Sequence, residues 1–417
     1  MKQIDIVLVG IGGYGKKYAN TLLGEGKRPE YEPYRVVGAV QRNPVRFKDD
    51  PLFKDIPLYA TLEEFYATNK ADLAIISTPI PLHREHIETC VGNGSNVLCE
   101  KPLCSSVEDA VAIQRLAEES DLKIFIGYQQ SFARGFKQLK EDILSGMFGK
   151  PLSFKTLICY PRSEKYYARN QWAGKIASDD GQLILDSPLH NAVAHHLNNM
   201  LFLLGDAPDT AASLKTLQAE LYRANPTIDN YDTVSLRAKT ESDVDFMFFT
   251  SHAIRDGDNI GPYNVFKFEN AVLFHDDKSN FEAFFAIFND GRVRRYEPFS
   301  GTDNSAVVQL QKTWDCIDDL RGGEKINSTV KASVPEVICV NATYLCRDIK
   351  QIDEKYVKYV GTPGERFATV EGLEDGLMRC FDEGKLFSEI GGIPWAEPTE
   401  EIEVARVFEE GFSPIKK

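Results

Sequence analysis

The feature that most constrains this chain is a glycine-rich turn close to its N-terminus. Residues 4–9, IDIVLV, form a short apolar run that predicts a buried strand, and residues 10–15, GIGGYG, follow it directly. Residues 16–23, KKYANTLL, are compatible with a helix. A strand, a tight glycine turn and a helix in this order are typical of a dinucleotide-binding unit.

Each glycine of the turn has a physical role. Gly10 permits the sharp turn, Gly12 lets backbone approach a pyrophosphate, and Gly15 lets the helix pack close to the strand. The backbone amides and the positive end of the helix dipole then face the phosphates. The turn therefore predicts a nucleotide site that is formed by Gly10, Gly12, Gly13, Tyr14 and Gly15.

Length and composition indicate a two-domain cytoplasmic protein. The 417 residues exceed one ordinary core, and the net charge of −14 without a basic tract disfavours nucleic acid. No apolar run approaches the roughly 20 residues of a membrane span, and no export signal precedes the first strand. Eight cysteines without CxxC spacing favour reduced thiols over disulfides or a structural zinc site.

The end of the second predicted strand bears on the choice of cofactor. In such folds an acidic residue there binds the ribose 2′-hydroxyl of NAD, whereas an arginine accommodates the 2′-phosphate of NADP. This chain carries Gln41 and Arg42 after residues 35–40. The missing carboxylate favours NADP, although a neutral glutamine also tolerates NAD, and Arg42 pointing into solvent is the alternative.

Strands and helices alternate over the first 128 residues. Apolar runs at 71–76, 96–99 and 123–128 predict strands, and residues 61–66 and 83–90 predict helices. This order predicts an α/β domain, residues 1–128, with a doubly wound parallel Rossmann sheet. Ligands bind at the carboxyl ends of such strands, so we expect one crevice lined by Thr78, Pro79, Lys101 and Gln129.

Lys101 is followed by a proline at the end of a buried strand. The restricted backbone would direct its ammonium group into the crevice. Position alone equally allows an ordinary solvated lysine.

Four motifs resemble, in order and spacing, those of the Gfo/Idh/MocA oxidoreductases. They are GIGGYG at 10–15, STP at 77–79 with His83 following, EKP at 100–102, and DSPLH at 186–190. The resemblance covers roughly the first 200 residues and implies an NAD(P)-dependent enzyme whose catalytic group is Lys101, Asp186 and His190. It adds Ser77, His83 and Glu100 to the expected cofactor contacts, beside Gln41 and Arg42. The chain departs from the family at Val193, where many members have an aspartate that touches a sugar hydroxyl.

The second predicted domain, residues 129–417, is α+β. Residues 132–148 and 334–348 predict helices, and clean alternation at 234–238 and 244–248 with a hairpin turn at 289–291 predicts an open, mostly antiparallel sheet. One face of such a sheet needs covering, so we expect a homodimer or homotetramer through this sheet.

The segment 184–197 carries the second half of the expected site. Ser187 is a good helix N-cap and Pro188 a good first helical residue, which would let Asp186 and His190 face the same spot. A carboxylate favoured by the helix dipole and a hydrogen-bonded core imidazole are the structural alternatives. Adjacent His195 and His196 point about 100° apart, so we expect no metal.

Polar side chains near this segment are candidates for binding substrate. Asn191 and His195 share a polar stripe of the helix, and loop arginines and aromatic residues often serve recognition. The candidates in the preceding loop are Tyr160, Arg162, Tyr166, Arg169, Asn170 and Trp172.

Together these features predict hydride transfer between nicotinamide and a hydroxyl or carbonyl of a sugar, cyclitol or sugar derivative. In this hypothesis His190 exchanges the proton, Asp186 orients the imidazole, and Lys101 holds the reacting oxygen. Two alternatives remain: an NAD-dependent glycosidase that uses transient oxidation, and a regulator that binds NAD(P) without turnover.

Overall fold

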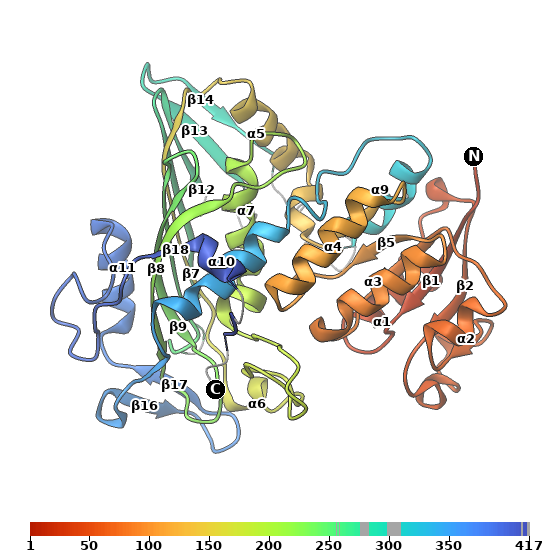
Figure 1. Ribbon diagram of the computed structural model, residues 1–417, viewed down its shortest axis with the longest axis horizontal. Helices are drawn as coiled ribbons and strands as arrows, with labels where there is room; N and C mark the ends of the chain where they lie inside the picture. The colour runs from red at the N-terminus through yellow and green to blue at the C-terminus, as the bar shows by residue number, and fades with distance from the viewer. Residues whose placement is uncertain (256, 258, 276–282, 298–309, 410–411, 415–417) are drawn as a thin grey trace.

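The N-terminal lobe is built on a six-stranded parallel sheet with the order β3-β2-β1-β4-β5-β6 (Figure 1). The computed structural model describes residues 1–255, 257, 259–275, 283–297, 310–409 and 412–414. The strands are β1 (Ile4–Val9), β2 (Tyr34–Val40), β3 (Leu58–Tyr59), β4 (Leu73–Ile76), β5 (Asn96–Cys99) and β6 (Ile124–Ile126). The predicted doubly wound sheet is therefore confirmed.

Helices on both faces of this sheet explain why its strands are almost continuously apolar. They are α1 (Gly15–Leu23), α2 (Leu62–Tyr66), α3 (His83–Gly92) and α4 (Val107–Glu119). Side-chain caps fix two of the helix starts. The Thr61 hydroxyl accepts a hydrogen bond from the Glu64 amide, and the Ser106 hydroxyl accepts one from the Asp109 amide.

The second lobe contains a ten-stranded sheet with the order β14-β13-β12-β11-β7-β10-β9-β8-β15, and β18 also pairs with β8. Only the β10–β7 and β15–β8 pairs are parallel, so the sheet is mostly antiparallel, as predicted. Its strands are β7 (Pro151–Cys159), β8 (Leu214–Arg223), β9 (Thr233–Thr240), β10 (Asp245–Ser251), β11 (Ile260–Phe268), β12 (Ala271–His275), β13 (Phe284–Phe288), β14 (Val293–Arg295), β15 (Lys350–Gln351) and β18 (Ile402–Glu403).

Helices cover the two faces of this large sheet unequally (Figure 1). On the face toward the N-terminal lobe lie α5 (Arg134–Leu144), α7 (Ala194–Leu204) and α10 (Val334–Cys346), which share one apolar core with the strands. On the opposite face α11 (Leu373–Glu383) packs over β7 and β10, beside a small hairpin of β16 (Val357–Val360) and β17 (Phe367–Val370). Elsewhere on the strands the apolar side chains of Leu152, Ile287 and Val293 remain exposed.

One helix from the second half of the sequence returns to the N-terminal lobe. Trp314 of α9 (Gln311–Leu320) is 1% exposed and packs against the rings of Tyr31 and Tyr34, at centroid distances of 5.1 and 5.4 Å. Leu310 and Ile317 join the same core as β1. A segment beyond residue 300 therefore completes the core of the lobe that we assigned to residues 1–128.

Two further observations concern the chain as a whole. None of the helices in the described ranges has the length and hydropathy needed to cross a membrane. All eight cysteines are buried and unpaired.

Replacing Trp314 with alanine should lower the free energy of unfolding by about 3–5 kcal/mol, since a fully buried aromatic side chain is lost. Urea unfolding of the full chain measures this change. The matched control is Phe408→Ala. Because Phe408 is 55% exposed, its replacement should lower the free energy of unfolding by less than about 0.5 kcal/mol. Equal stability of the two variants would contradict the packing of α9 on the N-terminal lobe.

Candidate active site

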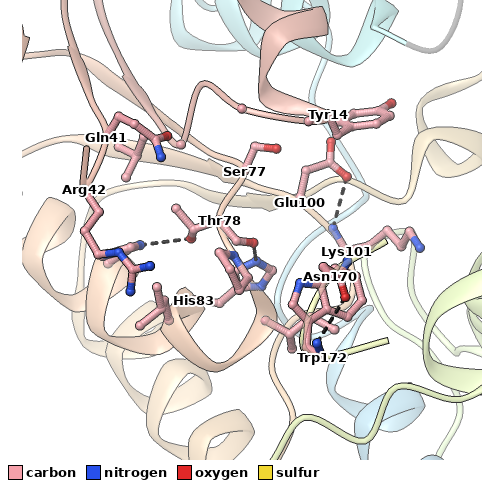
Figure 2. Close-up of a pocket in the computed structure, with 18 of the residues that line it drawn as sticks. Tyr14, Gln41, Arg42, Ser77, Thr78, His83, Glu100, Lys101, Asn170 and Trp172 are labelled. Carbon is pink, nitrogen blue, oxygen red and sulfur yellow. Dashed lines mark hydrogen bonds between the residues drawn. The ribbon is translucent and has the colours of Figure 1, made fainter. Parts of the chain in front are cut away.

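A cavity of about 1090 Å³ lies where the carboxyl ends of β1, β4 and β5 face the second lobe (Figure 2). From the N-terminal lobe it is lined by Gly10, Gly12, Gly13, Tyr14, Gln41 and Arg42, and by Ser77, Thr78, Pro79, His83, Glu100 and Lys101. From the second lobe it is lined by Gln129, Arg162, Tyr166, Asn170, Trp172, Asn191 and His195. Most of the residues singled out in the sequence therefore meet in one space.

The glycine turn has the geometry that a bound diphosphate needs. Gly10 has a φ of +81°, and a Cβ there would lie 2.7 Å from the Ser77 carbonyl oxygen. A Cβ on Gly15 would lie 1.9 Å from the Gly10 carbonyl oxygen, so helix and strand touch as predicted, although Gly15 itself does not line the cavity. Added Cβ atoms at Gly12 and Gly13 would meet nothing closer than 3.8 Å, which leaves their backbone open to a ligand.

The residues after β2 are placed at one end of the cavity. The Gln41 side-chain oxygen accepts a hydrogen bond from the Ile11 amide at 3.1 Å, so Gln41 braces the glycine turn. Arg42 lines both the main cavity and an adjoining pocket of about 500 Å³, to which Arg46 also contributes. Sequence reasoning missed Arg46, and its spacing of four residues from Arg42 was the only available signal.

Two polar residues near the cavity are held by other parts of the protein. The His83 ring nitrogens lie 3.0 Å from the Thr78 carbonyl oxygen and 2.9 Å from that of Pro102, so His83 ties together the loops after β4 and β5. The Glu100 carboxylate receives hydrogen bonds of 2.5 Å from Lys312 and 2.5 Å from the Tyr18 hydroxyl. Lys312 was not singled out by any sequence signal.

Lys101 reaches the second lobe. Its Nζ donates to the backbone and side-chain oxygens of Asn191 at 2.7 and 3.2 Å. Asn191 in turn donates to Asp186 at 2.6 Å, and the other Asp186 oxygen accepts from the Gly174 amide at 2.6 Å. Asp186 is 4% exposed and does not line the cavity, so its hydrogen-bonded connection to Lys101 runs through Asn191.

Burial shifts the pKa values of both Lys101 and Asp186. It lowers the pKa of Lys101, against the opposing charges of Glu100, Glu336 and Asp186. Burial also raises the pKa of Asp186, against hydrogen bonds from Gly174 and Asn191. Each group is thereby moved toward its neutral form, which makes proton exchange easier.

His190 is not placed as expected. Ser187 does cap the turn, but residues Pro188–Ala192 form a π-helical turn (η6), closed by a hydrogen bond from the Val193 amide to the Pro188 carbonyl, before α7 begins. The wider turn carries the residue four positions after Asp186 away from it. The fully buried His190 ring lies 3.2 Å from Glu336 Oε1 and 3.0 Å from the Cys104 carbonyl oxygen, outside the cavity lining.

The expected substrate residues divide into two groups. Trp172, Asn191 and His195 line the cavity, and Figure 2 shows Trp172 and Asn170 close to Lys101. Tyr160 and Arg169 do not line it; each supports a neighbour through a ring and guanidinium contact. Within the described residues, no group of three or more His, Cys, Asp or Glu side chains could hold a metal ion.

Comparison with known proteins finds a family model that matches the N-terminal lobe. Residues 4–128 match the model of the GFO_IDH_MocA family, an oxidoreductase family with an NAD-binding Rossmann fold. The N-terminal lobe is thus similar to the NAD-binding domain of the Gfo/Idh/MocA oxidoreductases. The match ends at residue 128, so Asp186, His190 and Arg162 lie beyond it.

Individual relatives of this chain are distant. A 2,7-anhydro-N-acetylneuraminate hydratase from Mediterraneibacter gnavus is 25% identical over 212 residues, covering 50% of this chain and 51% of that protein. An NADP-dependent scyllo-inositol 2-dehydrogenase from Bacillus subtilis is 25% identical over 198 residues, covering 45% and 52%. The chain thus spans about half the length of the curated relatives it matches.

Solved structures show that the fold similarity extends further. An oxidoreductase from Agrobacterium radiobacter, solved with NAD+, L-tartaric acid and magnesium, has a TM-score of 0.65 at 16% identity. The match covers 82% of this chain and 96% of that one. The similarity in fold therefore extends over both lobes of this chain.

The contact between His190 and Glu336 gives a test of the buried part of the site. His190→Leu should lower the free energy of unfolding by about 3–5 kcal/mol, because it leaves a buried carboxyl group without its partner. The double variant His190→Leu with Glu336→Leu should lose less than the sum of the two single losses. Urea unfolding of the four proteins measures this, and strictly additive losses would contradict a direct pairing.

Proposed function

We propose that this protein is an NAD(P)-dependent oxidoreductase that transfers a hydride between nicotinamide and a hydroxyl or carbonyl group of a sugar, cyclitol or sugar derivative. The observation that carries the proposal is that the open glycine turn and Lys101 line one continuous cavity. The names of two relatives, scyllo-inositol 2-dehydrogenase and D-xylose 1-dehydrogenase, support the substrate class.

The residues of the cavity fit the cofactor. The backbone at Gly12 and Gly13 would hold the diphosphate at the start of α1, and the loop of Ser77, Thr78 and Pro79 would line the path toward Lys101. When bound, nicotinamide supplies the acceptor or donor of the hydride.

Lys101 is the proposed catalytic group. Its Nζ would bind the reacting oxygen and exchange a proton with it, which the lowered pKa of Lys101 favours. Asn191 orients the amine, and Asp186 positions Asn191. The proton exchange that the sequence assigned to His190 does not fit the buried place of its ring, so we assign His190 to holding the η6 turn that carries Asn191.

The cofactor of this proposal is NADP in preference to NAD. Arg42 and Arg46 line the pocket beside the ribose end of the cavity, and within the described residues neither has an ion pair. No carboxylate contributes to that pocket. Two unpaired guanidinium groups suit a 2′-phosphate.

A reaction without net oxidation is the second candidate. The hydratase names of two relatives favour it over a regulator, since both are catalytic names without a redox product. In this alternative the same cavity would support transient oxidation, as in an NAD-dependent glycosidase. Product analysis with a chromogenic glycoside separates the two, because only cleavage releases the aglycone. A regulator without turnover would need no lysine in the cavity, which argues against that reading.

The assembly and location are part of the same proposal. We infer a homodimer or homotetramer through the outer face of the large sheet, supported by exposed Leu152, Ile287 and Val293. A monomer in light scattering at micromolar concentration would rule it out. The eight unpaired cysteines support a cytoplasmic location.

Replacing Lys101 with methionine should lower kcat by about 10²–10⁴-fold while cofactor binding stays almost intact, since the amine acts on the reacting oxygen. In the wild type, alcohol oxidation should rise with pH until Lys101 is deprotonated, and the variant should lack this limb. Stopped-flow absorbance of the nicotinamide measures both. Lys54→Met, at an exposed lysine, is the control, and wild-type turnover in Lys101→Met would refute the assignment.

Replacing Arg42 and Arg46 together with alanine should reduce the preference for NADP over NAD by about 10–100-fold, because two charged hydrogen-bond donors to the phosphate are lost. Calorimetric titration with NADP and NAD measures the ratio of dissociation constants. Lys48→Ala serves as the control, since exposed Lys48 does not line the pocket. An unchanged ratio would contradict the placement of the 2′-phosphate.

A further inference from the structure

The part of the cavity near Lys101 is positively charged. Among the lining residues from the second lobe, Arg162 is the only charged one. The nearest carboxylate of the lining, Glu100, is bound by Lys312 and Tyr18. The remaining carboxylates of the lining, Glu63 and Glu85, belong to α2 and α3 of the nucleotide-binding lobe.

The Arg162 guanidinium group has aromatic support but no counter-ion. Its centre lies 4.5 Å from the centroid of the Tyr166 ring and 5.6 Å from that of Tyr160. The group donates a hydrogen bond to the carbonyl oxygen of the preceding Pro161, at 3.1 Å. Its Nε atom is buried without an acceptor in the described part of the chain, and no described carboxylate lies within ion-pair distance of the group. An unsatisfied charged donor of this kind is uncommon and marks a place where a ligand is expected to bind.

A second arginine reinforces this charge. The Arg169 guanidinium group lies 3.5 Å from the centroid of the Tyr166 ring and 5.1 Å from that of Trp172, so two guanidinium groups contact one tyrosine. Arg169 forms no ion pair with a described carboxylate, although its charge acts on the nearby Asp186 carboxyl group and opposes the rise of its pKa. A neutral sugar would leave the Arg162 charge uncompensated, whereas an anion in the cavity would compensate it.

The shortage of hydrogen-bond acceptors in the cavity lining also favours an anionic ligand. Neutral sugars are held largely by groups that accept hydrogen bonds from hydroxyls, and the second lobe contributes no carboxylate to this cavity. Asp186 is bonded to Asn191 and Gly174, and Val193 is fully buried in the core. Lys101 and Arg162, in contrast, can only donate.

We propose that the substrate is an acid of a sugar or cyclitol, whose carboxylate is bound by Arg162 while a hydroxyl or carbonyl of the same molecule lies at Lys101. This inference rests on the proposed function and names the substrate class of the same site. The planar guanidinium group binds a carboxylate through two parallel hydrogen bonds, and Tyr166 and Tyr160 hold its plane in place. Arg169 raises the positive potential around the bound carboxylate.

Matched pairs of substrates test the charge directly. The full-length protein with NADP or NAD is assayed with D-glucuronate against D-glucose and with D-galacturonate against D-galactose. D-glucose 6-phosphate tests whether a phosphate is preferred to a carboxylate. We expect kcat/KM for the uronates to exceed that for the neutral sugars by at least about 10-fold, as for a charged hydrogen bond. A preference for the sugar phosphate over both uronates would overturn the carboxylate assignment.

Variants of Arg162 test the residue. Arg162→Gln should lower kcat/KM for the uronates by about 10–100-fold and change that for the neutral sugars less than about 2-fold, while Arg162→Lys should retain part of the uronate activity. Arg115→Gln is the control, since Arg115 is exposed on α4 outside the cavity. Neutral sugars turned over as well as uronates, with equal losses for both in Arg162→Gln, would overturn the anion proposal and leave the oxidoreductase standing.

Binding separates the two proposals if turnover fails. Absence of hydride transfer with every compound and both cofactors would refute the proposed function alone. Calorimetric titration of glucuronate into the protein saturated with NADP then decides the anion proposal. Binding to the wild type that is lost in Arg162→Gln and weakened by salt would support it, and no binding to the wild type would overturn it.

Discussion

The buried ion pair between Glu100 and Lys312 fixes the backbone on which the site depends. It joins the end of β5 to α9, and Tyr18 of α1 and the carbonyl oxygen of Gly127 complete it. A carboxylate this deeply placed needs a charged partner, and α9 supplies one from 212 residues away. Because Glu100 is thus occupied, the neighbouring Lys101 forms no ion pair in the described part of the chain and turns to the neutral Asn191.

This arrangement makes the site a property of both lobes together. Lys101 comes from the nucleotide-binding sheet, whereas Asn191 lies on the η6 turn of the second lobe. The contact between His190 and Glu336 of α10 anchors that turn on the side away from the cavity. A movement between the lobes would therefore separate the amine from its orienting partner.

The sequence predicted features that depend on residues close together in the chain, and it missed contacts between residues far apart in the chain. The glycine turn, the helix at 61–66 and the alternation of β9 and β10 depend on residues a few positions apart, and they folded as expected. The partners Lys312 and Glu336 lie more than 140 residues from Glu100 and His190, so no local pattern announces them. Spacing misled at His190 because one π-helical turn replaces the expected α-helical one.

The burial of Val193 is consistent with our proposal that the loop before η6 recognises the substrate. Its side chain is fully buried, so η6 presents only Asn191 and Ala192 to the cavity. The loop compensates with a rigid platform: Asn170 caps the amides of Trp172 and Ala173, and Glu164 pairs with Arg366 of the neighbouring hairpin. A rigid loop would let the Arg162 guanidinium group stay without an ion pair at a cost in folding stability, and in our proposal a bound anion offsets that cost. A loop of this kind would select substrates by their charge more strongly than by the arrangement of their hydroxyl groups.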